Sequence, residues 1–152
     1  MKTFYEWLLQ ESQQVNQQQA NQIISGHKGP ISAEGIRTDM LDQAFKVGNQ
    51  VEYDENFPIN NISTRMQGFG MDSVLEIINK MLQAIGIQPV TNAQDVKNIP
   101  NLQSLYPKLI EMIPPAIISI MPDDTVSLMD GNHRYGVSKV LGLPTIKAFI
   151  IR

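Results

Sequence analysis

Cysteine is absent from this chain of 152 residues, and histidine occurs only twice, at His27 and His133. The absence of cysteine excludes disulfides, thiolate metal sites and cysteine nucleophiles together. Two histidines are too few for a histidine-rich metal centre. The cysteine-free composition fits a reducing compartment.

Long apolar runs and an excess of positive charge are also lacking. No apolar segment approaches the roughly 20 residues that a membrane-spanning helix needs, and the N-terminal segment has no small-residue cleavage pattern of a signal peptide. We therefore expect a cytoplasmic protein with no membrane partner. The net charge of −3 argues against a broad basic surface, and so against strong sequence-independent binding to duplex nucleic acid.

The composition that remains is that of an ordinary globular domain, with 42% hydrophobic and 18% charged residues. The N-terminal part is predicted to start with a helix, because Thr3 and Glu6 have the spacing of a capping box. Seven glutamines follow between positions 10 and 22. They are compatible with a solvated helix, with a partner-binding or oligomerising helix, or with low-complexity disorder. His27 lies in the glycine- and proline-containing break after them, where we expect an ordinary loop.

Two further helices are predicted before residue 90. One spans 39–47 and is capped by Thr38. The other spans 74–85, where apolar residues recur at helical spacing after a capping box that begins at Ser73. Residues 49–70 show no clear period, and we expect a long irregular connection there.

After residue 90 the periodicity changes. Residues 91–100 fit either a helical turn or a short edge strand. The following segments predict a helix over 102–113, kinked or restarted at Pro107, a β-hairpin made of 116–120 and 125–129, a helix over 132–141 and a strand over 145–151.

One motif concentrates chemistry-bearing residues at the start of that last helix, in the sequence Asp130-Gly131-Asn132-His133-Arg134. A helix N-terminus offers unpaired N–H groups and a partial positive charge, which suit a phosphate or a carboxylate. Arginine binds oxyanions in a bidentate manner, and histidine exchanges protons near neutral pH. The alternative is structural: Asp130 or Asn132 caps the helix, Gly131 supplies an unusual backbone angle, and Arg134 and His133 face solvent or pair with Asp130.

The order of these elements resembles the fold shared by ParB-like N-terminal domains and sulfiredoxins. The resemblance covers about a third of the chain, residues 96–152, and rests on the D-G-N-H-R-Y turn and the following K-V-L-G-L-P segment. It implies a phosphate-binding turn made of Gly131, Asn132, His133 and Arg134. It also implies His133 and Asp130 as catalytic candidates, and Asp130 as the ligand of a magnesium ion that accompanies a nucleoside phosphate.

This chain departs from the two families in two ways, and each departure removes one of the functions that the resemblance implies. Sulfiredoxins carry their catalytic cysteine where this chain has Asn132, so their reaction is excluded. ParB proteins of chromosome partition carry further domains after this core, whereas this chain stops at Arg152, and we expect it not to be a full partition protein. One scaffold hosts several chemistries, so the fold alone does not select among them.

The sequence therefore predicts an α+β fold, with a helical N-terminal region over 1–90 packed on a small mixed-sheet core of ParB/sulfiredoxin type over 91–152. Arg65, or an acid such as Glu52 or Glu55, is expected to approach the ligand. The predicted function is nucleotide-phosphate binding, with phosphoryl transfer or nucleotide hydrolysis as the implied reactions, and whether the protein is an enzyme is left open. The alternatives are a small ParB-like nuclease or DNA-binding factor, and a non-catalytic protein whose glutamine-rich helix binds a partner protein.

Overall fold

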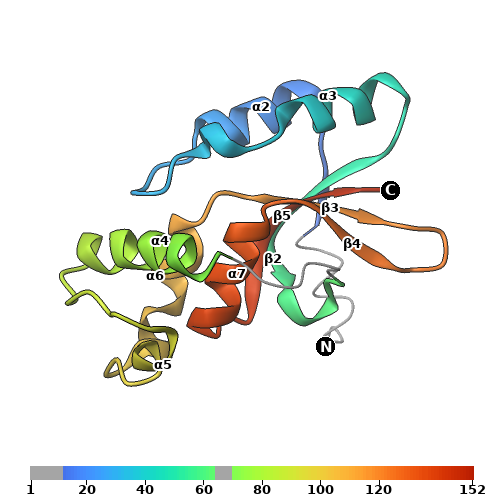
Figure 1. Cartoon of the computed structure of the whole chain (residues 1–152). Helices are drawn as coiled ribbons and strands as arrows, with labels where there is room; N and C mark the ends of the chain where they lie inside the picture. Colours follow the sequence, from blue (N-terminus) through green and yellow to red (C-terminus); the bar gives the residue numbers. More distant parts are fainter. Residues whose placement is uncertain (1–11, 64–69) are drawn as a thin grey trace, which may run out of the picture.

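A computed structural model of the chain describes residues 12–63 and 70–152. These residues form an α+β fold with six α-helices and a mixed sheet of five strands, as predicted (Figure 1). The helices are α2 (Gln17–Ser25), α3 (Thr38–Lys46), α4 (Met71–Ala84), α5 (Ala93–Val96), α6 (Tyr106–Met112) and α7 (Asn132–Leu141). The capping box predicted at Thr3 and Glu6 lies outside the described residues.

The sheet has the strand order β1-β2-β5-β3-β4. Its strands are β1 (Gln13–Gln14), β2 (Val51–Pro58), β3 (Ala116–Ile120), β4 (Val126–Asp130) and β5 (Thr145–Ile151). The central strand β5 pairs antiparallel with β2 and parallel with β3, and β3 forms the predicted hairpin with β4. Two of the five strands precede residue 90, so the sheet joins the helical N-terminal region to the C-terminal core.

The expectation of an irregular connection over 49–70 is wrong for residues 51–58, because β2 occupies these eight residues beside the central strand. Residues 64–69 of this range lie outside the described residues. A shift of register between Asp54 and Phe57 interrupts its pairing with β5. The buried side chains of β2 therefore include Val51, Asp54 and Phe57, spaced three residues apart. That spacing removes the two-residue alternation by which a half-buried strand is identified.

Helices cover both faces of the sheet (Figure 1). Along β5, Ile146, Ala148 and Ile150 are buried in a cluster that includes Tyr135 of α7. Phe149 points the other way and packs with residues of α2 and α3. Because side chains alternate along a strand, Lys147 lies on the face of Phe149, toward α2 and α3.

A third apolar cluster joins α4, α6 and α7. Its fully buried side chains include Ile78 and Leu82 of α4, Leu109 of α6 and Val137 of α7. These side chains recur at helical spacing, which is why the helices were predictable from the sequence. Because α7 contributes Tyr135 to a cluster on the sheet and Val137 to this one, it lies between α4 and the sheet.

The ends of several helices differ from the predictions. α4 begins at Met71, before Ser73, and no side chain caps it. α3 begins at Thr38 itself rather than after it. Pro107 lies in the first turn of α6, where a missing N–H is tolerated, so it starts a helix instead of kinking one. The segment after residue 90 is helical, as α5, and is capped by Asn92.

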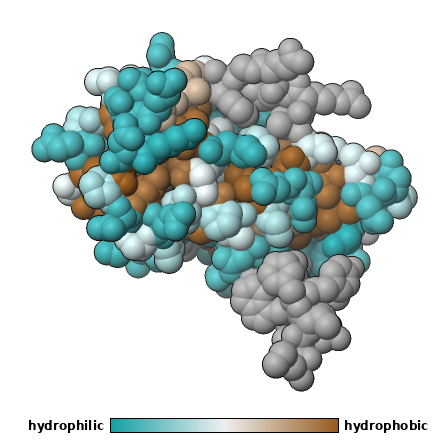
Figure 2. Space-filling view, turned by 90° about the horizontal axis from the view of Figure 1, so that it is seen from below, coloured by the Kyte–Doolittle hydropathy of each residue, from teal (hydrophilic) through white to brown (hydrophobic). Residues whose placement is uncertain are grey.

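The hairpin β3–β4 extends beyond the helices that cover the sheet (Figure 1). At its outer end Ile120, Val126 and Leu128 are only partly buried. Figure 2, which views the molecule from below, shows hydrophobic residues in brown on the right of the molecule, bordered by hydrophilic residues in teal. Among the described residues, no helix is both long and apolar enough to cross a membrane.

Candidate functional site

The predicted turn lies between β4 and α7, and its geometry depends on Gly131. This glycine precedes the helix with φ of 105°, in the left-handed region that other residues avoid. A Cβ atom at this position would lie 3.1 Å from the Cβ of Ala116 and 3.1 Å from Nε of Arg134. Gly131 therefore supplies the unusual backbone angle and also leaves room for the Arg134 side chain to fold back across the turn.

Arg134 is held inside the protein. Its Nη2 donates to Oδ2 of Asp130 at 2.9 Å, and its Nη1 donates to the backbone carbonyl of Pro115. The two charged side chains are only 11% and 16% exposed. The guanidinium is thus committed to partners within the fold, and the predicted pairing with Asp130 is confirmed.

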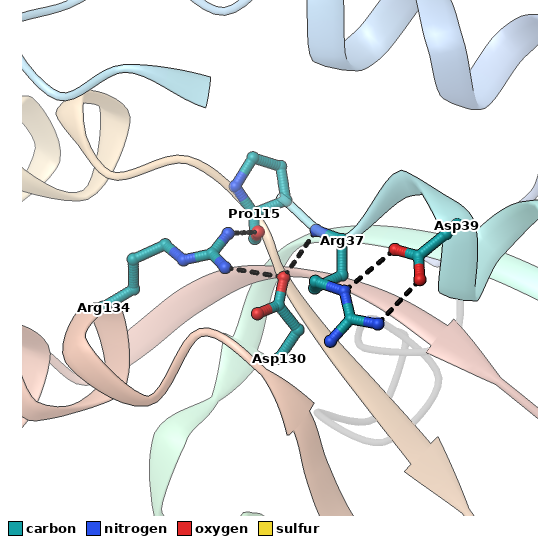
Figure 3. A network of polar contacts seen from close by, with 5 residues as sticks. All are labelled: Arg37, Asp39, Pro115, Asp130 and Arg134. Atoms are coloured by element: carbon teal, nitrogen blue, oxygen red, sulfur yellow. Dashed lines mark hydrogen bonds and ion pairs between the residues drawn. The ribbon is translucent and has the colours of Figure 1, made fainter. Parts of the chain in front are cut away.

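The same oxygen of Asp130 has a second donor from a distant segment. The backbone N–H of Arg37, the residue before α3, donates to Oδ2 of Asp130 at 2.8 Å (Figure 3). No side chain of its own segment caps α3, so Asp130 supplies an acceptor at this helix start. The Arg37 guanidinium pairs with Asp39 at 2.7 Å, and both side chains are more than half exposed.

Asp130 therefore connects three segments: the end of β4, the first turn of α7 and the start of α3. Sequence reasoning did not identify Arg37, because 93 positions separate it from Asp130 and no local pattern connects them. The start of α3 and the start of α7 meet at this carboxylate (Figure 3). Such a convergence of two helix N-termini concentrates partial positive charge at one place.

The remaining residues of the turn have different environments. Asn132 is half-buried and His133 is exposed. Neither Asp130 nor Asn132 caps α7, since no side chain in the part of the chain that the structure describes accepts a hydrogen bond from its first N–H groups. The capping alternative is therefore wrong. The imidazole of His133 makes no hydrogen bond or ion pair with the described residues, so Asp130 does not orient it.

The carboxylate of Asp130 is already engaged within the fold, since its Oδ2 accepts two N–H groups, one of them from a cationic side chain. The described ranges hold no group of three or more histidine, cysteine, aspartate or glutamate side chains that could bind a metal ion. A magnesium ion that accompanies phosphates needs only one or two carboxylates besides the phosphate oxygens, so Asp130 as its ligand stays a prediction.

The other residues that we expected near a ligand are scattered. Glu52 of β2 pairs with Arg152, which follows β5, and accepts a hydrogen bond from Ser12. Arg65 lies outside the described residues. Glu55 lines a cleft of about 710 Å³ that also contains Pro115 but none of the residues from Asp130 to Arg134. The turn and this cleft are therefore separate features that meet at Pro115.

Comparisons of the chain with protein-family models, with curated proteins and with solved structures found no match. The resemblance to ParB-like domains and sulfiredoxins stays a prediction that rests on the turn motif and the order of elements.

Proposed function

We propose that the protein binds a nucleoside phosphate, with a phosphate group at the N-terminus of α7. The observation that carries this proposal is that α7 starts after a left-handed glycine, with no side chain of residues 12–63 or 70–152 hydrogen-bonded to its first N–H groups. A phosphate oxygen would accept from those groups and would be stabilised by the helix dipole. The exposed His133 would add a hydrogen-bond donor at the rim.

In this proposal Arg134 and Asp130 are positioning residues. Arg134 holds the turn against Pro115 and Asp130, and Asp130 brings the start of α3 beside it. The Arg37 guanidinium at that helix start is paired with Asp39, so its positive charge is balanced there. Phosphoryl transfer and nucleotide hydrolysis remain predictions, because they need a positioned nucleophile and a metal in addition to a bound phosphate.

The proposal places the protein in the cytoplasm, which its cysteine-free composition supports. Nucleic-acid binding stays an alternative prediction, and the net charge of −3 disfavours it. A role of the glutamine-rich segment in binding a partner protein also stays a prediction; the described part of this segment contributes to β1 and to α2.

The direct test is a thermal-shift titration with nucleoside mono-, di- and triphosphates, each with magnesium. Asn132→Asp is the informative variant, because it places a carboxylate at the start of α7, where the charge favours the helix but repels phosphate. Asn98→Asp is the matched control, since Asn98 is exposed and the change in net charge is the same.

We expect one nucleotide class to raise the melting temperature of the wild type and of Asn98→Asp, by ligand linkage to the folded state. The same nucleotide should leave the melting temperature of Asn132→Asp unchanged. A shift of equal size in Asn132→Asp, or no shift with any nucleotide in the wild type, would contradict the proposal.

A further inference from the structure

The cleft beside Pro115 has the composition of a ligand site. Three parts of the fold enclose it: α2 together with the loop that follows it, α6, and the sheet face on which Lys147 of β5 lies beside β2. Its volume of about 710 Å³ is in the range of small-molecule pockets. Ile23, Tyr53, Ile110 and Pro115 provide an apolar wall. The polar lining residues include His27 and Lys28 in the loop after α2, Glu111 of α6 and Lys147 of β5.

Lys147 is the central polar group of the cleft. It is half-buried on the central strand, and its Nζ donates to the backbone carbonyl of Glu111 at 2.8 Å. It also lies 3.5 Å from Nδ1 of His27. No carboxylate of the described residues lies within ion-pair distance of this ammonium group. Its charge is therefore held partly out of water without a carboxylate in direct contact.

His27 does not supply a counter-charge either. Its Nε2 lies 2.9 Å from the carbonyl oxygen of Ile31, which only accepts, so Nε2 carries the proton. Nδ1 then presents a lone pair to the ammonium of Lys147. Burial lowers the pKa of His27, the hydrogen bond to Ile31 works against this, and the charge of Lys147 lowers the pKa further. The imidazole is therefore neutral at pH 7 and orients Lys147 as an acceptor.

An ammonium group has three N–H donors, and two of those on Lys147 are directed at Glu111 and His27. The third is available to a ligand. Burial lowers the pKa of Lys147, and the carboxylates of Glu111 and Glu55 offset this only in part. An anion placed against Nζ would offset the free-energy cost of holding this charge partly out of water.

We propose that this cleft binds a small molecule with an aromatic or apolar body and one anionic group, a carboxylate or a phosphate, which pairs with the ammonium of Lys147. The apolar body lies against Tyr53, Ile110 and Pro115. The proposal is independent of the start of α7. Glu55 and Glu111 border the cleft, and their charges favour a ligand with a single anionic group over a highly charged one.

The test uses benzoate and phenyl phosphate as probes, with benzyl alcohol as the neutral analogue, in NMR titrations of the whole ¹⁵N-labelled chain. We expect both anions to shift amide signals of residues that line the cleft. Benzyl alcohol should bind at least about tenfold more weakly, as is typical when a charge-assisted hydrogen bond is lost. The tighter of the two anions identifies carboxylate or phosphate as the natural group.

Lys147→Met tests the pairing directly, since methionine keeps the apolar stem of the side chain. Lys108→Met is the matched control, because Lys108 is exposed on α6 and does not line the cleft. We expect Lys147→Met to weaken benzoate binding about tenfold or more, Lys147→Arg to retain it, and Lys108→Met to match the wild type.

The proposal is overturned if neither anion binds, if benzyl alcohol binds the wild type as tightly as benzoate, or if the shifted amides lie elsewhere. It is also overturned if a folded Lys147→Met variant keeps the affinity of the wild type. The comparison of benzoate with benzyl alcohol needs no variant, so it decides the question even if Lys147→Met does not fold. Asn132→Asp leaves this cleft intact, so failure here is distinguishable from failure of phosphate binding at α7.

Discussion

Arg134 and Asp130 form a nearly buried ion pair at 2.9 Å, one helical turn apart, with the carboxylate preceding the helix that carries the arginine. Removing the charge of Asp130 leaves the guanidinium without a counter-charge and weakens the acceptor for the N–H of Arg37. We expect Asp130→Asn to lower the free energy of unfolding by on the order of 3 kcal/mol. Chemical denaturation measures this change.

The exposed Asp124→Asn is the control. It changes a residue whose φ of 65° asparagine tolerates, so it should change the free energy of unfolding by only a few tenths of a kcal/mol. Equal effects of the two variants would show that the pair contributes nothing specific.

Gly131→Ala probes the turn itself. The added Cβ would meet Ala116 and Arg134 at 3.1 Å, in a backbone conformation with φ of 105°. We expect a loss of about 1–3 kcal/mol in the free energy of unfolding, from backbone strain and displacement of Arg134. Gly35→Ala is the control, because a Cβ added there would have no neighbouring atom within 4 Å. An unchanged melting temperature for Gly131→Ala would mean that the turn relaxes without cost.

The stability of the fold should depend on pH through His27. The pKa of His27 in the folded state lies below its ordinary value of 6.5, chiefly because of burial. Below pH 6.5 the unfolded chain therefore binds more protons than the folded one, so stability is fully present above this pH and falls as the pH decreases toward the folded-state pKa. His27→Gln, whose side-chain amide still donates to Ile31, should reduce this slope in melting temperatures recorded between about pH 7 and pH 5.

The wild type, measured over the same pH range, provides the comparison for that experiment. If His27→Gln left the slope unchanged, the partly buried imidazole of His27 would not be its source.

Phe149 tests how firmly α2 and α3 are attached to the sheet. Its ring is fully buried, and its centroid lies 5.2 Å from that of Tyr53 on the neighbouring strand. We expect Phe149→Ala to cost about 3–5 kcal/mol of stability through lost burial and a residual cavity. Val47→Ala, at a side chain that is 62% exposed, should be nearly neutral in the same denaturation experiment. A loss below about 1 kcal/mol for Phe149→Ala would indicate that the helices repack over the vacated space.

The C-terminal elements were predictable because their signals are local. The hairpin has two β-branched segments on either side of a turn, and α7 ends at Gly142, whose φ of 74° is the left-handed cap typical of helix ends. The strand β2 was missed because its pairing irregularity at Asp54 and Phe57 disrupts the alternation on which strand prediction depends. Its partner strand is also remote in sequence.

In the candidate site too, the local features could be predicted from the sequence and the contacts between distant residues could not. The left-handed angle at Gly131 and the pairing of Arg134 with Asp130 follow from residues within one turn of a helix. The contact of Asp130 with Arg37 joins residues 93 positions apart. The cleft around Lys147 combines residues from α2, the loop after it, β2, α6 and β5. Nothing in the sequence near His27 indicates that a lysine 120 positions later lies beside it.

The central position of β5 has a consequence for the order of folding. In the hydrogen bonding of the sheet, β5 joins the pair β1–β2 to the hairpin β3–β4, and β5 follows all four strands in the sequence. Val51 of β2 pairs with Ile151 of β5, 100 positions later. During synthesis the earlier strands must therefore wait for residues 145–151 before the sheet can close. Pairings across such long separations slow the search for the native state, so the exposed edges of β2 and β3 are the surfaces that newly made chains have to protect from aggregation.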